Sequence, residues 1–187
     1  IRDSYYDAHL PLAPPEHLLK VFPAQPYLAE VMRVDEQWGN LWKAFQSSSD
    51  RPAYLVVVGD HGESQGEHGE PTHGQFVYRS SMRVPMMIYG PGVQPERESA
   101  PVSLVDLMPS ILGQLDIDPA DNLDGISVFS SIAALERWIY GETFHPRYHF
   151  GFSELHVIQS EGNRYIRAPI PEYYEYRSDP SELTNTY

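Results

Sequence analysis

The sequence contains no cysteine. Disulfides, thiolate-bound zinc and a thiol nucleophile are therefore excluded within these 187 residues. Basic residues are also scarce, because 13 Lys and Arg stand against 26 Asp and Glu, which gives a formal net charge of −13. A nucleic-acid partner needs a basic surface and is not expected here. No apolar run approaches the ~18 residues that span a bilayer, so no membrane segment is expected in this chain either.

The rest of the composition is that of a folded protein. Hydrophobic residues make up 41% and aromatic residues 12% of the chain, which is enough to bury a core and argues against disorder. A length of 187 residues suggests about one domain. The chain begins at Ile1 rather than Met, so either a segment was removed or the sequence is part of a longer protein.

Hydrophobic periodicity predicts alternating helices and strands. After Pro26, apolar residues recur at spacings of three and four, which predicts a helix that the Ser47–Asp50 run ends. The run from Tyr54 to Asp60 (YLVVVGD) predicts a strand covered on both faces by helices. Val84–Tyr89 predicts a second, short strand. This alternation predicts an α/β fold for the first two thirds of the chain.

Three smaller features refine this prediction. Tyr5–Pro15 has too many prolines for a helix and predicts a strand end that runs into a loop. Trp38 and Trp42, four residues apart on the predicted helix, are expected in the core. Ser103 with Asp106 predicts a capping box before a second helix, whose apolar residues are Leu104, Leu107, Met108, Ile111, Leu112 and Leu115. Pro109 lies inside that helix and is expected to bend it.

Beyond Val128 the pattern changes to that of a small antiparallel appendage. A short helix is predicted over Ala133–Tyr140, and short strands over Tyr165–Arg167 and Tyr173–Tyr176. The sequence thus predicts two parts. Residues 1–127 would belong to an α/β domain, and residues 128–187 to a small α+β subdomain.

The segment Asp60–His73 (DHGESQGEHGEPTH) carries the densest set of reactive side chains. It directly follows the predicted strand Tyr54–Asp60, and ligands in open α/β sheets bind beyond the carboxyl ends of strands. Carboxylates and imidazoles bind divalent cations, and without thiolates a hard or borderline ion is favoured. A solvated polar loop remains the alternative reading of this composition.

Several motifs resemble the sulfatase branch of the alkaline phosphatase superfamily. Within the polar segment these are Asp60-His-Gly-Glu63, Gly66-Glu-His-Gly69 and His73-Gly74, followed by Met82-Arg-Val-Pro85 and Gly90-Pro-Gly92. Outside it, the matching stretches are Tyr6-Asp-Ala-His-Leu-Pro11, Val102-Ser-Leu-Val-Asp106, Asp124-Gly125, and Glu172–Tyr176 with Asp179, Pro180, Glu182 and Asn185. Each motif is short, but together they occur in the family's order along nearly the whole chain.

The resemblance implies a fold and a set of site residues. The fold would be part of an alkaline-phosphatase-like central sheet flanked by helices, with the antiparallel subdomain after it. Asp60 and His61 would be ligands of a divalent metal ion, most often calcium and sometimes manganese in this family. His9 and His73 would be catalytic residues that contact the sulfate group or the departing oxygen. His73 stands where many relatives carry lysine.

The resemblance also implies what this chain does not contain. The family's nucleophile is a formylglycine made from Cys or Ser in a C/S-x-P-x-R motif, and no such motif occurs here. The family's N-terminal aspartate ligands are missing as well. We therefore expect the chain to be the C-terminal portion of a sulfatase-like hydrolase and to be inactive alone. The substrate would be a small-molecule or carbohydrate sulfate ester, and export to the periplasm or outside the cell would fit the family.

Two alternatives remain open at this point. The Asp-His-Gly-Glu motif is shared with phosphodiesterases, phosphonate monoester hydrolases and phosphoethanolamine transferases of the same superfamily. The chain would alternatively act as a non-catalytic metal-binding module, in which the motif persists without turnover.

Overall fold

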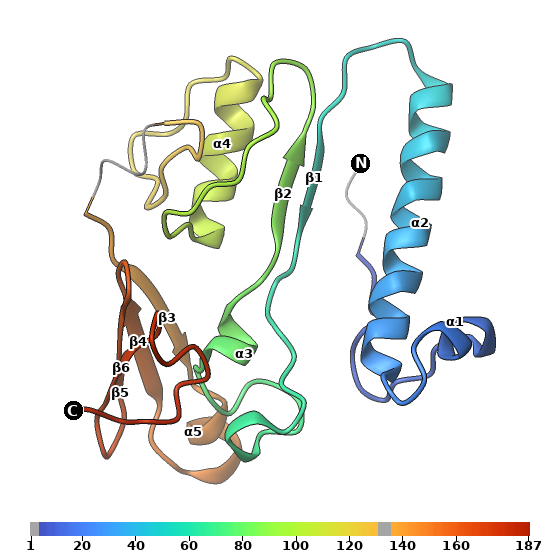
Figure 1. Ribbon diagram of the computed structural model, residues 1–187. Coiled ribbons are helices and arrows are strands. Elements are labelled where there is room, and N and C mark those ends of the chain that lie inside the picture. The colour runs from blue at the N-terminus through green and yellow to red at the C-terminus, as the bar shows by residue number, and fades with distance from the viewer. Residues whose placement is uncertain (1–3, 131–135) are drawn as a thin grey trace. The chain divides into compact units, whose positions relative to one another are not determined.

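The computed structural model describes residues 4–130 and 136–187 (Figure 1). Helices and short strands alternate along the chain, as expected for a mixed α/β protein. The chain divides into two compact units. Unit 1 comprises Ile1–His73 and Val84–Gln94, and unit 2 comprises Gly74–Arg83 and Pro95–Tyr187. None of the described helices is long and apolar enough to cross a membrane.

Unit 1 contains two helices, α1 (Glu16–Val21) and α2 (Pro26–Ser48), which pack against each other. The helix predicted after Pro26 is confirmed. Pro26 stands at its first position, where the missing N–H would have no helical partner. Trp38 and Trp42 are half-buried rather than in the core, so that expectation was wrong. The side chains that these helices bury are those of Leu18, Ala29 and Glu30.

The two strands predicted in unit 1 are confirmed as β1 (Leu55–Val58) and β2 (Met86–Tyr89). They pair antiparallel, with Leu55 opposite Tyr89. The structure describes all four β1 residues, and Val57 alone among them is buried, so the expected helix cover on both faces is wrong here. Trp42 of α2 packs edge-on against Tyr89, with ring centroids 5.8 Å apart, which places this helix beside the strands.

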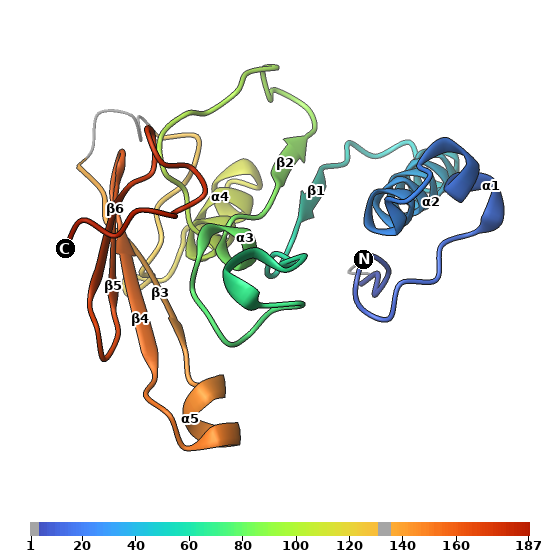
Figure 2. The same cartoon turned by 60° about the horizontal axis from the view of Figure 1, so that its bottom comes forward.

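Unit 2 contains a four-stranded antiparallel sheet in sequence order (Figure 2). Its strands are β3 (Ile139–Thr143), β4 (Leu155–Gln159), β5 (Asn163–Arg167) and β6 (Glu172–Glu175). β5 and β6 confirm the strands predicted near Tyr165 and Tyr173. The helix predicted over Ala133–Tyr140 is wrong at Ile139 and Tyr140, which alternate between half-buried and exposed as strand residues do. Residues 133–135 lie outside the described residues.

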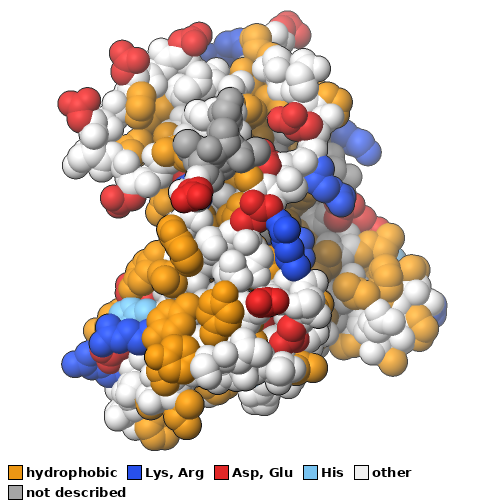
Figure 3. Space-filling model, turned by 60° about the vertical axis from the view of Figure 1, so that its left-hand side comes forward, with side chains coloured by type: hydrophobic (Ala, Val, Ile, Leu, Met, Phe, Trp, Pro, Cys, Tyr) orange, Lys and Arg blue, Asp and Glu red, His pale blue; other side chains and the backbone are white. Residues whose placement is uncertain are grey.

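The two faces of this sheet differ. One face supplies Val157, Ile166 and Tyr174 to a core that also includes Val77, from the segment before α3 (Arg79–Met82). On the other face, four residues lie opposite one another across the strands: Tyr140, Ile158, Tyr165 and Tyr173. Figure 3, with the left-hand side of Figure 1 brought forward, shows hydrophobic side chains gathered in a patch on this side. The sheet is therefore packed on one face and more open on the other.

The capping box predicted at Ser103 is present. The Ser103 N–H donates to Asp106 Oδ2 over 2.8 Å at the start of η2 (Leu104–Asp106), which leads into α4 (Leu107–Gln114). Pro109 lies in the first turn of α4, where its missing N–H breaks no helical bond, so the expected bend inside a longer helix does not arise. A last helix, α5 (His145–Phe150), follows β3.

Candidate active site

The polar segment begins directly where β1 ends. The Gly59 N–H donates to the Pro85 carbonyl over 3.1 Å, which continues the strand pairing up to the residue before Asp60. The loop then folds back on itself, because the Ser64 N–H donates to the Thr72 carbonyl over 2.7 Å. This backbone bond brings Glu63 and His73, the residues just outside it, close together.

The tip of the loop is a short turn, η1 (Glu67–Gly69). The Gly66 N–H donates to the Glu70 carbonyl over 3.0 Å and closes this turn. Gly66 and Gly69 have φ angles of 108° and 78°, in the left-handed region that favours glycine. The glycines of the motif therefore shape the loop.

His9 reaches the site from a separate loop, which α2 holds in place. The Glu30 side chain of α2 is buried and accepts the backbone N–H groups of Ala8 over 2.8 Å and Ala13 over 2.5 Å. These two hydrogen bonds fix the backbone before and after His9. The expected strand end at Tyr5–Pro15 is wrong, since the structure shows turns and loop from Ser4 to Pro15.

Three histidine rings meet at this place. The centroids of His61 and His73 lie 3.9 Å apart, and those of His9 and His73 lie 5.0 Å apart. The structure thus brings together three of the four residues predicted for the site. Asp60 stands at the edge, with a side chain 92% exposed and Oδ1 3.9 Å from His61 Nε2.

All three rings use Nδ1 in the same way. His9 Nδ1 lies 2.6 Å from the Leu10 carbonyl, and His61 Nδ1 lies 3.0 Å from the Gly62 carbonyl. Because a carbonyl only accepts, Nδ1–H must be the donor in both cases. His73 Nδ1 lies 2.8 Å from Glu63 Oε2. The Nε2 atoms are therefore the ones presented for chemistry, although that of His9 also lies 3.4 Å from the Tyr6 hydroxyl.

Glu63 is the site residue that the sequence analysis did not assign. It was visible as the last letter of Asp-His-Gly-Glu, but nothing in the sequence showed that its carboxylate turns inward. One ligand atom each from His9, Glu63 and His73 lie within 4.8 Å of one another. The cluster therefore concentrates two imidazoles and a carboxylate in a small space.

The residues Asp60 and His61 fit a divalent ion. Oxygen and imidazole ligands lie about 2.0–2.6 Å from a divalent ion, so two ligand atoms of one ion are separated by roughly 3–5 Å. The 3.9 Å between Asp60 Oδ1 and His61 Nε2 falls in this range. The His61 Nδ1 bond to Gly62 leaves Nε2 unprotonated in the neutral ring, as a metal ligand requires. Two ligands alone do not complete a coordination sphere.

The motif residues of unit 2 have structural partners instead. Both oxygens of Asp106 accept from Arg137 over 2.8 Å, and Oδ1 also accepts the Ile126 N–H over 2.9 Å. Burial opposes ionisation of Asp106, but the Arg137 guanidinium and the backbone donors outweigh it and lower the pKa of this carboxyl. Gly125 is fixed by space, because an added Cβ would lie 2.0 Å from the Val105 carbonyl oxygen.

The motif residues near the C-terminal end, Glu172 and Glu182, also have structural partners. Glu172 accepts the hydroxyls of Tyr78 over 2.9 Å and Tyr174 over 2.6 Å, and burial together with this carboxylate raises the pKa of both phenols. Glu182 pairs with Arg164 in the interior over 2.9 Å. These contacts join elements of unit 2 and stabilise it.

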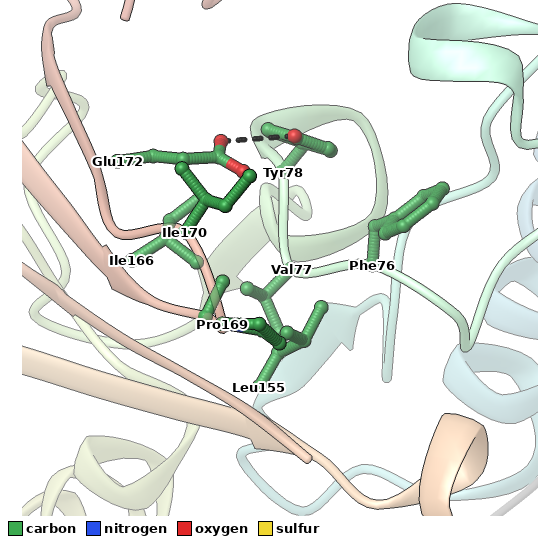
Figure 4. Close-up of a pocket in the computed structure, with 9 residues that line it drawn as sticks. Phe76, Val77, Tyr78, Leu155, Ile166, Pro169, Ile170 and Glu172 are labelled. Carbon is green, nitrogen blue, oxygen red and sulfur yellow. Dashed lines mark hydrogen bonds between the residues drawn. The ribbon is translucent and has the colours of Figure 1, made fainter. Parts of the chain in front are cut away.

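Unit 2 also has a hollow of about 270 Å³ beside its core (Figure 4). Figure 4 shows Val77, Leu155 and Pro169 lining it, with the Tyr78–Glu172 hydrogen bond at one end. Its walls are mostly apolar, and the nine residues that line it include no imidazole. It lacks the groups for hydrolysis that unit 1 concentrates.

Comparison with known proteins identifies first the class and then the family. Solved structures with the same fold are hydrolases of the alkaline phosphatase superfamily. The Sulfatase family model matches residues 22–117. The chain belongs to the sulfatase family. The expected fold class, with its antiparallel subdomain, is thereby confirmed.

Three relatives illustrate the match. Arylsulfatase K of Xenopus laevis is 27% identical over 147 residues, which cover 71% of this chain and 27% of the relative. The phosphonate monoester hydrolase of Agrobacterium radiobacter is 25% identical, with a TM-score of 0.65, covering 86% of this chain and 36% of that one. BT4656, solved with its substrate D-glucosamine-2-N,6-O-disulfate, is 22% identical with a TM-score of 0.68, covering 86% and 35%. The chain thus spans about a third of the length of these relatives.

Proposed function

We propose that unit 1 forms the metal-binding and anion-binding part of the active site of a hydrolase that cleaves sulfate esters. The observation that carries this proposal is the convergence of His9, His61, His73 and Glu63 next to Asp60, at the end of β1. The family match supports the class of reaction. The roles of the individual residues follow from their chemistry.

Asp60 and His61 would hold a divalent metal ion, for which we propose calcium. When bound, the ion supplies Lewis-acid stabilisation of the sulfate oxygens. In their doubly protonated form, His9 and His73 would bind the same group through Nε2–H and deliver that proton to the departing oxygen. Both Nδ1 atoms already have acceptors, which leaves each ring fixed for this task.

The nucleophile would be a formylglycine. No C/S-x-P-x-R motif occurs in these 187 residues, so this chain alone is expected to show no turnover. We propose that the nucleophile comes from the part of a sulfatase domain that the relatives have in addition to the region matched here. In that arrangement residues 1–127 belong to the catalytic domain and residues 128–187 to the subdomain.

A sulfated carbohydrate is the substrate that we propose. The support is the relationship to BT4656, whose substrate is a glucosamine disulfate. A second candidate is hydrolysis of a phosphonate monoester. It is favoured by the phosphonate monoester hydrolase of Agrobacterium radiobacter, which is 25% identical and matches 86% of this chain.

A direct experiment compares the two substrate classes. The chain would be produced within a protein that carries the remainder of a sulfatase domain, and hydrolysis of an aryl sulfate and of an aryl phosphonate monoester would be measured side by side. Faster hydrolysis of the sulfate supports the proposal, and faster hydrolysis of the phosphonate supports the second candidate. The chain alone, with calcium or manganese added, serves as the control and should be inactive. Turnover by the chain alone would contradict an external nucleophile.

A further inference from the structure

Tyr6 presents a large aromatic ring to solvent beside the candidate active site. The residue is 73% exposed, and its ring stacks on that of His9, with centroids 4.4 Å apart and planes inclined by 30°. The Tyr6 hydroxyl lies 3.4 Å from His9 Nε2, so the polar tips of both side chains emerge at one edge of the stacked pair. The imidazole covers one face of the Tyr6 ring, and the rest of the ring is open.

The residues on both sides of Tyr6 are tied to α2. Before it, the Tyr5 ring packs edge-on against Trp38, with centroids 6.2 Å apart. After it, Asp7 pairs with Arg33 over 3.1 Å. Single exposed apolar side chains are common and need no explanation on their own. Tyr6 differs because its neighbours in sequence pack against a helix, while its own ring stays exposed next to a proposed catalytic histidine.

The backbone between Tyr6 and His9 is strained. Ala8 has a φ of 66°, in the left-handed region that a residue with a Cβ rarely adopts. The Ala8 N–H donates to Glu30 over 2.8 Å, which holds this conformation. Ala8 lies in the turn that folds Tyr6 back onto His9. Strain beside a candidate site is retained where the resulting geometry has a use, and the geometry here is an exposed ring fixed against an imidazole.

We propose that Tyr6 is a specificity-determining residue whose open ring face stacks against the ring of the substrate, so that the site prefers sulfate esters of an aryl group or a pyranose to acyclic esters. This inference rests on the proposed function, because it places the sulfate at His9 and His73. A tyrosine ring offers a flat apolar face, which fits another ring or the C–H face of a sugar, and a hydroxyl for polar groups at its edge. A short alkyl sulfate has no such face.

The position of the ring suits this role. A sulfate held at His9 Nε2 lies at the edge where the Tyr6 hydroxyl also emerges. The organic part of the ester is joined to the sulfate through a single oxygen atom and therefore starts directly beside that edge. From there, the open face of Tyr6 is the adjoining aromatic surface.

The first test measures binding to the 187-residue chain, without any turnover. Dissociation constants would be obtained from the shifts of the His9 and His73 NMR signals with 4-nitrophenyl sulfate, glucose 3-sulfate and methyl sulfate, with calcium added. Either ring ester should bind about 10-fold more tightly than methyl sulfate, and Tyr6→Ala should reduce this preference to about 2-fold or less. Nuclear Overhauser effects should connect ring protons of the ligand with those of Tyr6. A preference for one of the two ring esters alone supports the proposal and identifies the class of ring.

Two outcomes of this test contradict different claims. Equal dissociation constants for the ring esters and methyl sulfate in the wild type would overturn the role of Tyr6, and this measurement needs no variant. No shift of His9 or His73 with any of the esters would instead refute the proposed function.

The second test measures turnover of 4-nitrophenyl sulfate in a protein that carries this chain with the remainder of a sulfatase domain. Tyr6→Ala should raise KM about 10-fold with kcat changed less than about 3-fold, because ground-state and transition-state binding are lost together. The inhibition constant of inorganic sulfate, which has no ring, should stay unchanged. Tyr6→Phe keeps the ring and should keep the wild-type KM. Tyr187→Ala removes a similarly exposed tyrosine of unit 2, 75% exposed, and should change nothing.

The variants separate the ring from the hydroxyl. An unchanged KM in Tyr6→Ala would overturn the proposal. Equal losses in Tyr6→Phe and Tyr6→Ala, with weaker inhibition by sulfate, would also overturn it, because the hydroxyl would then act through His9. An inactive wild type whose isolated chain still prefers ring esters would refute hydrolysis and leave recognition by Tyr6 standing.

Discussion

The two units use similar motif residues for opposite purposes. In unit 1, the side chain of Asp60 is 92% exposed and its Oδ1 accepts the His61 N–H, while His61 and His73 use Nδ1 for their hydrogen bonds and turn Nε2 to the site. In unit 2, Asp106 and Glu182 are buried and already committed to arginine and backbone donors. A family motif therefore marks positions that matter but does not say why they matter. Burial and hydrogen-bond partners distinguish motif residues that are candidates for catalysis or binding from those that stabilise the fold.

The units also differ in how they are held together. The core of unit 2 includes Val157, Ile166 and Tyr174 from three adjacent strands. Unit 1 relies on a two-stranded sheet and on Glu30, which clamps the loop of His9. Two strands alone are only marginally stable in water. Because the candidate site residues lie in unit 1 and the buried Arg164–Glu182 pair lies in unit 2, we expect substitutions of these residues to change mainly function in unit 1 and mainly stability in unit 2.

The largest expected effect is on function, at Asp60. In a protein that carries this chain with the remainder of a sulfatase domain, Asp60→Ala should lower aryl sulfate turnover by at least about 10²-fold, since the proposed metal ligand is lost. Metal content should fall, while thermal unfolding measured on the metal-free proteins stays unchanged because this side chain is 92% exposed. Asp35→Ala, an exposed aspartate of α2, is the matched control. Unchanged metal content in Asp60→Ala would contradict the ligand assignment.

The largest effect on stability is expected at the buried pair of unit 2. Arg164→Met should cost about 3–5 kcal/mol, because Glu182 would remain buried without its charge partner. Denaturant unfolding measures this change. The double variant with Glu182→Gln should regain part of the loss. Arg177→Ala breaks an exposed pair with Glu161 and should cost at most about 1 kcal/mol. Equal losses of unfolding free energy in Arg164→Met and Arg177→Ala would contradict a larger contribution from the buried pair.

A smaller effect, which depends on pH, is expected at Asp106. Its pKa is lowered in the folded protein, so its ionised form stabilises unit 2 above the unfolded pKa of about 4. This contribution is lost as the pH falls through the folded pKa. Asp106→Asn should therefore lower the free energy of unfolding by about 1.5–3 kcal/mol at pH 7. The difference in unfolding free energy between this variant and the wild type should become smaller toward pH 2. Unfolding curves across this range, with exposed Asp121→Asn as control, provide the check. A gap that does not depend on pH would contradict the assignment.

The smallest effects compare two glycines of unit 1. Gly69 has a φ of 78° with open space around an added Cβ, so Gly69→Ala should cost about 1–2 kcal/mol from backbone strain alone. Gly39 lies within α2, also with open space, and Gly39→Ala should stabilise by about 0.5–1 kcal/mol. Thermal unfolding distinguishes the two signs. Stabilisation by both substitutions would mean that the loop does not require its left-handed turn.

Local patterns predicted the elements that local forces determine. The helix after Pro26 and the Ser103 capping box depend on nearby residues, and both are confirmed. The Ala133–Tyr140 prediction was wrong where Ile139 and Tyr140 pair with β4, because strand pairing is a long-range contact. A short apolar run fits helix and strand equally well.

The candidate site, too, was predicted only in part from the sequence. The four residues chosen from the motifs were those whose side chains have visible chemistry, and His9, His61 and His73 do meet in space. The inward turn of Glu63 was not predictable, because it follows from the Ser64–Thr72 backbone bond. Nor was the contribution of Glu30, which acts on the loop from a helix more than 15 residues away in sequence.

The ladder of contacts at the C-terminal end has a practical consequence for handling this protein. Glu182 bonds the Arg79 N–H, Asn185 accepts the Tyr173 N–H, and the Thr186 N–H reaches the Tyr173 carbonyl. Proteolytic trimming past Glu182 would therefore remove these contacts with Arg79 and β6 and leave Arg164 without its carboxylate partner. Affinity tags fused after Tyr187 need a flexible spacer, and resistance to carboxypeptidase offers a quick assay of correct folding.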